Sequence, residues 1–580
     1  MKAYPALLGA VLTCWLLAGC RQPTAVVTLP VPPAGSETHA SPSEAAPQPT
    51  SSATISGVVV DDRGSPLAGA TVRLQASPSA TLSGQGGAFT LTAPAGAATV
   101  TISAWKQAYY CGLVAEVRPP AAGLEIVLRP VQTNDNPAYA WIPPTGENSC
   151  YSCKPGVTQV WLDSDAHGRS ATNPRYLTMY NGTDVSGRQS PQTRYATSRD
   201  YGRIPLLPDP AQPYYGPGYK LDFPDSAGNC AACHNAGAAV DAPYATDPNR
   251  VRGVDTFGVH CDYCHKVADV RLDATSGLPY PNMPGVLSQD IRRPFPEDKE
   301  RYQLFFGSFD DDNVPMEDTY LPLIKESRWC APCHFGVFWD TVVYNSFGEW
   351  LASPYSDPAS GKTCQQCHMP APTIWNGQPM TNVAPGKGGV ERDPSTLPAH
   401  TFPGASSTEL LQQAVTLSAS AYREADRLVV EVTLVNDKTG HHVPTDSPLR
   451  QMILVVRARG GQGMDLLLQE GPTLPSWTGE GDPAKGNFAG LPGVAYAKVL
   501  EELWTQAAPT GAYWNPTRIQ SDNRLAAFAT DTNRFTFAAP DGPAEITVQL
   551  LFRRAFKSLM DQKGWDVPDI EMARQTLQVR

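Results

Sequence analysis

The chemistry of this sequence is concentrated in five pairs of cysteines, each pair separated by two residues. In chain order the pairs are Cys150/Cys153, Cys230/Cys233, Cys261/Cys264, Cys330/Cys333 and Cys364/Cys367. A side chain with a potential nitrogen ligand follows each pair, in the order Lys154, His234, His265, His334 and His368. Two thiols three residues apart can bond the two vinyl groups of one porphyrin, and the next side chain can then bind its iron. The spacing predicts five covalently bound haem c groups, which we number haem 1 to haem 5 in chain order.

Single Cys-x-x-Cys pairs also serve as zinc half-sites, redox pairs or halves of disulfides. Here ten of the 13 cysteines fall into such pairs, and a potential iron ligand follows every pair. A zinc ribbon needs no histidine after each pair, and a redox motif is not repeated five times in one chain. Haem attachment is therefore the interpretation that accounts for the whole pattern.

The spacing of the motifs predicts which haems are neighbours. Successive motifs begin 80, 31, 69 and 34 residues apart. The two short gaps leave room for about one helix and a turn, so haems 2 and 3, and haems 4 and 5, are expected to lie close together. The two long gaps contain enough chain to cross over and supply ligands.

Each iron has a second axial position, for which histidine is a common ligand. Outside the motifs and the N-terminal tether, the histidines are His167, His260, His400, His441 and His442, five for five irons. His260 directly precedes Cys261, so it is expected to point away from haem 3 and to reach a neighbouring haem. His441 and His442 share one turn between two predicted strands, and both stay candidates, with a preference for His442.

From residue 145 to 580 the chain resembles multihaem cytochromes c. His-Cys-x-x-Cys-His arrangements such as the one at residues 260–265 recur in that group. The stretch from Trp161 to His167 is loosely similar to its Trp-x-x-Ser-x-His element, and the loop at residues 398–404 is similar to a distal-ligand loop after the last haem. The turn at residues 436–445 resembles a Gly-His-x-x-Pro-Thr turn by which a C-terminal β domain supplies an imidazole to a haem. The resemblance implies that these histidines are iron ligands.

The first motif also resembles the ammonia-forming cytochrome c nitrite reductases, which have five haems and a Cys-x-x-Cys-Lys motif at the catalytic haem. Other features depart from that family: no Arg stands shortly before Cys150, no tyrosine pair follows His265, and no His precedes Cys330. We therefore expect an electron-transfer protein with no catalytic residues, and we keep a nitrite-reductase-like oxidoreductase as the alternative. The position of His167 distinguishes the two, because an iron that has Lys154 on one side and no ligand opposite would be open to substrate.

The N-terminus has the pattern of an exported lipoprotein. Residues 6–18 form an apolar run of signal-peptide length, and Leu17-Ala-Gly-Cys20 looks like a bacterial lipobox. The resemblance implies a signal peptide at residues 1–19, a lipid on Cys20 and a lipidated flexible tether at 20–52, rich in Pro, Ala, Ser and Thr. An ordinary secretory signal with an incidental cysteine is the alternative. We expect an extracytoplasmic protein, anchored through the lipid to a bacterial membrane, at the periplasmic face of an outer membrane or at the cell surface.

Two β-rich segments flank the haem region in the sequence. Residues 53–130 contain short β-rich runs between turn signals, which predict a β-sandwich. The order Gly57-Val-Val-Val-Asp-Asp-Arg-Gly64, Pro66 to Val72 and Gly87-Ala-Phe89 resembles the carboxypeptidase regulatory-like domain, a non-catalytic module. After a pentahaem domain at 131–404, residues 405–580 read as a second β-rich domain, with strands predicted at 414–420, 427–435, 452–458 and 546–552. The predicted fold is multidomain: two β-sandwich domains flanking a loop-rich, mostly α or irregular multihaem core.

Composition agrees with an exported, loop-rich protein. Apolar residues make up 41% of the chain and charged residues 17%, with 56 Pro and 48 Gly. The net charge of −11 argues against nucleic-acid binding, which needs clustered Lys and Arg. The predicted partners are redox proteins or extracellular electron acceptors, together with a membrane reached through the lipid.

Overall fold

The computed structural model describes residues 52–94, 96–164, 166–295, 303–311, 314, 318–539 and 542–580. The predicted signal peptide, the lipidation site at Cys20 and the tether as far as residue 51 lie outside these residues. No helix of the described parts is both long and apolar enough to cross a bilayer.

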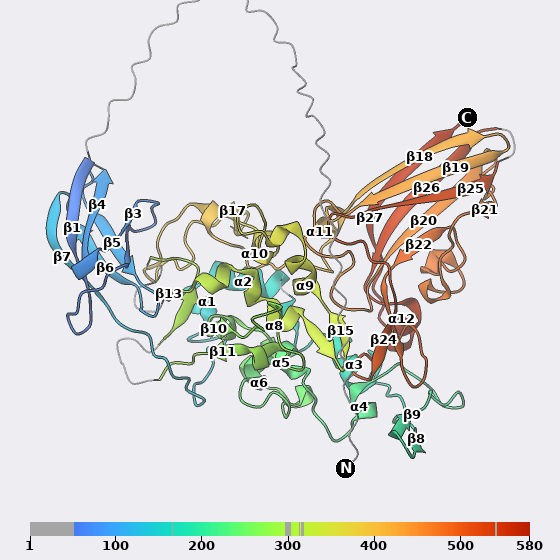
Figure 1. Ribbon diagram of the computed structural model, residues 1–580, viewed down its shortest axis with the longest axis horizontal. Helices are drawn as coiled ribbons and strands as arrows, with labels where there is room; N and C mark the ends of the chain where they lie inside the picture. The colour runs from blue at the N-terminus through green and yellow to red at the C-terminus, as the bar shows by residue number, and fades with distance from the viewer. Residues whose placement is uncertain are drawn as a thin grey trace, which may run out of the picture. The chain divides into compact units, whose positions relative to one another are not determined.

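The N-terminal segment folds as two small sheets around one apolar core (Figure 1, blue). Its strands are β1 (Ser52–Asp61), β2 (Thr71–Leu74), β3 (Ala80–Leu82), β4 (Ala88–Pro94), β5 (Val100–Trp105), β6 (Gly112–Val117) and β7 (Ala121–Leu128). The sheet order is β4-β1-β7 in one layer and β3-β2-β5-β6 in the other. In β4, alternate residues Phe89, Leu91 and Ala93 are buried while their neighbours face outward, as expected of a strand covered on one side. Cys111, which lies outside the five motifs, is buried.

In the central segment, each cysteine motif forms one short helix. These are α1 (Cys150–Cys153), α5 (Ala231–His234), α7 (Cys261–Cys264), α8 (Ala331–His334) and α10 (Cys364–His368). Capping fixes where several of them begin: Ser149 and Thr363 form capping boxes at α1 and α10. Because a helix places residues i and i+3 on one face, both thiols of a motif lie on the same side of the chain.

The rest of the central segment consists of short elements. The other helices are α2 (Pro155–Ser164), α3 (Pro174–Asn181), α4 (Tyr219–Asp222), α6 (Ala236–Ala239) and α9 (Ser346–Leu351). The strands form two-stranded pairs: β8 (Tyr195–Ser198) with β9 (Gly202–Pro205), β10 (Val267–Val270) with β11 (Gln289–Ile291), β12 (Phe305–Gly307) with β13 (Asp318–Tyr320), β14 (Gly336–Phe338) with β15 (Thr341–Tyr344), and β16 (Ile374–Trp375) with β17 (Gln378–Pro379). Such short elements bury little apolar area of their own, so a large prosthetic group is a natural source of packing here.

The C-terminal segment has two four-stranded sheets that share one core (Figure 1, orange to red). Its elements are α11 (Thr408–Gln412), β18 (Thr416–Glu424), β19 (Arg427–Val435), β20 (Gln451–Gly460), β21 (Leu468–Glu470), β22 (Gly493–Tyr496), β23 (Lys498–Glu502), β24 (Thr517–Asp522), β25 (Thr530–Ala538), β26 (Ala544–Arg553), α12 (Lys557–Lys563) and β27 (Ile570–Val579). The sheets run β18-β19-β25-β21 and β22-β20-β26-β27. The four strands predicted in this segment correspond to β18, β19, β20 and β26.

Strand β20 shows how this segment is packed. Met452, Leu454 and Val456 face the core between the two sheets. Ile453 and Val455 point the other way, against a loop that contributes Leu474 and Phe488. Both faces of the strand are therefore buried, which explains why its sequence is apolar almost throughout instead of alternating.

The chain is multidomain, as predicted, and it is rich in β-structure with a minority of helix. Separate apolar clusters belong to the N-terminal and C-terminal segments. The connection between β19 and β20, residues 436–450, leaves the C-terminal sheets and enters the central segment, where Thr445 contacts Glu349 of α9. This connection carries both histidines of the predicted ligand turn.

Candidate functional site

All five motifs line one cavity of about 1470 Å³. Ordinary ligand pockets measure roughly 300–1,000 Å³, so this space is larger than a single small molecule requires. Its wall contains the ten motif cysteines together with Lys154, His234, His265, His334 and His368. Of the five histidines outside the motifs, His167, His400, His441 and His442 also reach it.

Three motif histidines each face a histidine from a distant part of the chain. The rings of His265 and His400 are 6.5 Å apart between centroids and 30° from parallel. Those of His368 and His441 are 6.4 Å apart and 20° from parallel. The third pair is His334 and His167, with centroids 6.2 Å apart and rings nearly perpendicular, at 86°. The three centroid distances differ by only 0.3 Å although the ring angles differ widely.

That common distance fits a metal ion held between two imidazoles. A histidine nitrogen binds a transition metal at about 2.0 Å, and the ring centroid lies about 1.2 Å behind the nitrogen. Two imidazoles on opposite sides of one metal therefore have centroids about 6.4 Å apart. Direct stacking, by contrast, brings rings closer, as between His234 and Tyr176 at 4.1 Å. The residues present thus fit haem iron at motifs 3, 4 and 5.

Hydrogen bonds orient these imidazoles through their other ring nitrogen. Nδ1 of His265 lies 2.7 Å from the carbonyl oxygen of Phe306, and Nδ1 of His368 lies 2.7 Å from that of Pro403. Nδ1 of His441 lies 2.9 Å from the carbonyl oxygen of His442. A carbonyl can only accept, so each Nδ1 carries the proton and Nε2 keeps its lone pair for a metal. This is the usual second contact of metal-binding histidines.

Burial keeps several of these histidines neutral. It lowers the pKa of His234, His265 and His368 to about 4, and it lowers the pKa of His441 as well. A neutral imidazole is the form that binds metal, so these side chains are in the ligand state at neutral pH.

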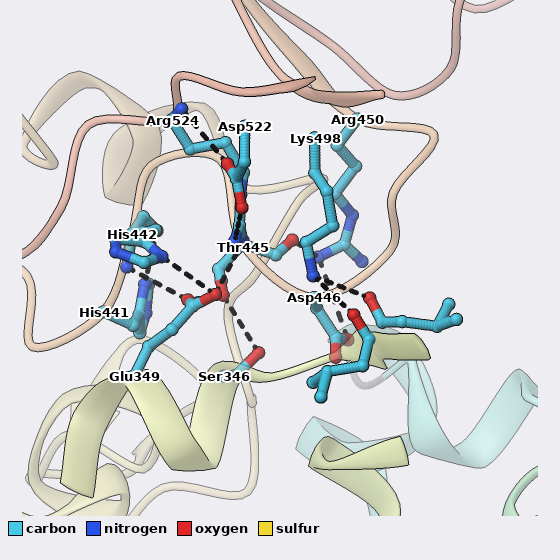
Figure 2. Close-up of polar contacts among 12 residues, drawn as sticks. Ser346, Glu349, His441, His442, Thr445, Asp446, Arg450, Lys498, Asp522 and Arg524 are labelled. Atoms are coloured by element: carbon cyan, nitrogen blue, oxygen red, sulfur yellow. Dashed lines mark hydrogen bonds and ion pairs between the residues drawn. The ribbon is translucent and has the colours of Figure 1, made fainter. Parts of the chain in front are cut away.

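The turn at residues 436–446 resolves the choice between its two histidines. His441 faces His368, whereas Nδ1 of His442 lies 3.0 Å from Oε1 of Glu349. The same carboxylate accepts a hydrogen bond from Arg524 Nη1 at 2.6 Å (Figure 2). The structure therefore favours His441 over the preferred His442 as the ligand of haem 5, because His441 is the imidazole that faces His368, while His442 contacts Glu349 on helix α9.

His260 does not reach the cavity, in contrast to the expectation that it binds a neighbouring haem. Its Nδ1 accepts a hydrogen bond from the backbone N–H of Tyr263 at 3.2 Å and so caps helix α7. Its Nε2 points toward Gly237, where an added Cβ would lie 2.5 Å away, and its ring packs edge-on against Trp141. A side chain used as an N-cap lies at the start of the helix and turns away from the face that carries the thiols.

The motifs contact one another in a continuous set. The thiols of Cys150 and Cys261, of Cys233 and Cys333, and of Cys330 and Cys364 lie near enough to shift one another's pKa. Tyr263 of motif 3 shares an apolar cluster with Ala231 and Ala232 of motif 2. The short sequence gaps thus correspond to neighbouring motifs. The contacts of motif 1 with 3, and of motif 2 with 4, were not predicted.

Motifs 1 and 2 differ from the other three. Within the parts of the chain that the structure describes, no histidine ring faces His234 at the distance found for the three pairs, and His167 lies opposite His334 rather than Lys154. The Lys154 amine is 5.6 Å from the ring centroid of Phe305. The ring of His234 is covered by Tyr176, stacked at 10° from parallel. Tyr176 donates a hydrogen bond from its hydroxyl to Asn235 Oδ1 at 3.1 Å.

In the described residues, the motif cysteines take part in neither a disulfide nor a metal-binding cluster of side chains. None of the cysteines from Cys111 to Cys367 forms a disulfide. No group of three or more His, Cys, Asp or Glu side chains in these residues is arranged to hold a metal ion without a porphyrin.

Two carboxylates at the site had not been identified from the sequence. Glu349 holds His442 and Thr445, and Asp446 lies beside Nδ1 of His334 at 3.6 Å. Burial lowers the pKa of His334, but the negative charge of Asp446 outweighs burial and raises it to about 9. Asp446 directly follows the Pro444-Thr445 element, which is the only signal that could have identified it. Glu349 stands in a sequence with no motif.

Comparison with known proteins gives one family match and several similar structures. Residues 54–110 match the carboxypeptidase regulatory-like domain. Among solved structures, a penta-haem cytochrome c552 from Thermochromatium tepidum is 19% identical, with a TM-score of 0.48, covering 74% of this chain and 97% of that chain. A type II cohesin–X-dockerin complex from Acetivibrio cellulolyticus is 22% identical, with a TM-score of 0.12, covering 13% and 56%. None of the curated proteins matches. The family match confirms the resemblance to the carboxypeptidase regulatory-like domain stated from the sequence.

Proposed function

We propose that this chain is a pentahaem cytochrome c that transfers electrons through covalently bound haems. The observation that carries the proposal is the set of three imidazole pairs, His265/His400, His334/His167 and His368/His441, at nearly one spacing around a cavity lined by all five motifs. Haem iron, when bound, accepts and releases one electron at a time. Two imidazoles on one iron fill both axial positions, which suits electron transfer because no position is left for a substrate.

The contacts between motifs support a continuous route. Thiol contacts join motif 1 to 3, motif 2 to 4 and motif 4 to 5, and a shared apolar cluster joins motif 2 to 3. Every motif therefore has at least one neighbour. The protein's own contribution is to hold five attachment sites within one cavity, to orient the axial imidazoles and to keep several of them neutral.

The location of the protein is part of the proposal. The lipobox at Leu17 to Cys20 supports export and attachment to a bacterial membrane through a lipid, with redox proteins or extracellular acceptors as partners. In this arrangement the β-sandwich domains flank the haem core, and the N-terminal one acts as a spacer between tether and haems.

Three measurements on the purified protein test the central claim. Intact mass should exceed the mass of the mature polypeptide by five haems, and acid–acetone treatment should leave the colour on the protein. Electron paramagnetic resonance should then resolve three bis-histidine low-spin haems. Extractable haem, or a mass that fits another number of groups, would contradict the proposal.

A second function is favoured by the place of His167. Because His167 lies opposite His334, it is not available as the second ligand of the iron beside Lys154. Haem 1 could then bind a small anion such as nitrite, which is the oxidoreductase alternative. Titration of the ferric protein with nitrite or cyanide at neutral pH distinguishes the two. Rapid binding at one haem in five supports the oxidoreductase, and no binding supports electron transfer alone.

A further inference from the structure

Asp446 is the one carboxylate that the structure places at the outer nitrogen of a motif histidine, within the described residues. Its Oδ2 lies 3.6 Å from Nδ1 of His334. At the other ligand histidines whose Nδ1 contact is established, His265, His368 and His441, the partner is a neutral backbone carbonyl. Nδ1 of His334 therefore faces a negative charge, whereas Nδ1 of each of the other three histidines faces a carbonyl dipole.

The protein holds this carboxylate in place at a cost. Asp446 has φ of +66°, a left-handed backbone conformation that a residue other than glycine adopts only with strain. Its side chain is mostly buried. Its Oδ1 is buried without a hydrogen-bond partner in the described structure, and the guanidinium of Arg450 is nearby, with Nη1 3.9 Å from Oδ2. Figure 2 shows Asp446 between Arg450 and the end of helix α9.

We propose that Asp446 is a positioning residue that makes haem 4 the hardest to reduce of the three bis-histidine haems. The proposal rests on the proposed function, since it requires His334 to bind iron. A carboxylate beside Nδ1 holds the ring's proton on that nitrogen, fixes the ring orientation and makes Nε2 a stronger donor. A stronger donor stabilises ferric over ferrous iron, which lowers the reduction potential.

The position of Asp446 also gives the C-terminal segment a role at two haems. The same turn that supplies His441 to haem 5 supplies Asp446 to the ligand of haem 4. Glu349 and Arg524 fix this turn through His442 and Thr445. The potential difference between the two neighbouring haems is thus set by one segment outside the haem-attachment region.

The test is redox potentiometry of the purified holoprotein with three substitutions. Asp446→Asn removes the charge and keeps the shape. It should raise the reduction potential of one haem by about 59 mV, a tenfold change in its one-electron reduction equilibrium. The potentials of the other four haems should stay unchanged. Arg450→Gln removes a cation near Asp446 and should shift the potential of the same haem in the opposite direction. Asp437→Asn is the matched control, because Asp437 is an exposed carboxylate of the same turn.

Haem content measured by mass distinguishes a failure of the proposed function from a failure of the role proposed for Asp446. A count other than five in the unsubstituted protein contradicts the proposed function and leaves the potentials uninterpreted. With five haems present, three results overturn the role of Asp446: no component moves, all components move together, or Asp437→Asn gives the same shift. If Asp446→Asn loses haem, Arg450→Gln decides, and an unchanged potential in that variant refutes the proposal.

Discussion

Substitution of His441 is the sharpest test of the axial ligands, because its neighbour His442 provides a control one residue away. His441 faces His368 across the cavity, while His442 is tied to Glu349. His441→Ala should remove one axial ligand of haem 5 and leave its thioether attachment intact. His442→Ala should leave all axial ligands in place.

The size of the expected change follows from the count of haems and contacts. His441→Ala converts one haem in five to high spin, so the bis-histidine signals fall from three to two. His442→Ala instead removes one hydrogen bond to a charged group, which costs about 1.5–3 kcal/mol of folding free energy. Glu349 keeps its contacts with Arg524 and Thr445 in that variant, so the turn should stay in place.

The assay is electron paramagnetic resonance of the ferric proteins at equal haem content, with thermal unfolding followed by circular dichroism. The assignment is refuted if His442→Ala opens a haem and His441→Ala does not. A high-spin signal in both variants would mean that the turn moves as a unit, and a Glu349→Gln variant would then show the same loss.

Four further predictions follow from particular residues. Burial raises the pKa of Glu349, but the hydrogen bond from His442 and the charge of Arg524 outweigh burial and lower it to about 2. This ionised carboxylate contributes about 3 kcal/mol to the stability of the folded state above about pH 4.5, and the contribution is lost as the pH falls toward 2. Acid titration should therefore convert haem 5 to high spin in that range. His260→Ala should leave the spin state of every haem unchanged and lower the melting temperature, since it removes only a helix cap; a new high-spin signal would restore His260 as a ligand. In Lys154→His, cyanide binding at haem 1 that is retained would place the open position on the side of the iron opposite residue 154. Suppressed binding would mean that a second ligand occupies that side. Cys20→Ser should release the protein from membranes with an unchanged visible spectrum, and continued membrane association would mean that the lipobox is incidental.

Much of the fold could be predicted from local sequence. The strands of the C-terminal segment have long apolar runs bounded by turn residues, and β18, β19, β20 and β26 lie where the pattern placed them. The match at residues 54–110 agrees with the resemblance stated for the N-terminal segment. The pairing of strands into two sheets around one core depends on contacts between distant residues, which no local pattern specifies.

Haem attachment and axial ligation depend on the sequence in different ways. The two thiols and the next side chain of a motif are neighbours on one helical turn, so spacing alone identified all ten cysteines and the residues after them. An opposing ligand comes from anywhere in the chain. Composition supplied the candidates, but it could not pair His167 with His334 or His400 with His265.

The tertiary structure decided the choices between adjacent or similar residues. His441 and His442 are equivalent by residue type, and only Glu349, on helix α9, distinguishes them by holding one and leaving the other to face His368. His260 has the position expected of a ligand, but its Nδ1 caps helix α7 and its ring lies outside the cavity. The sequence by itself predicted iron-binding groups and the residues that would attach them. Which imidazole faces which depends on how three segments fold around one cavity. Opposing ligands are distant in the sequence and meet only in the folded chain, whereas the residues of one motif are neighbours in the sequence.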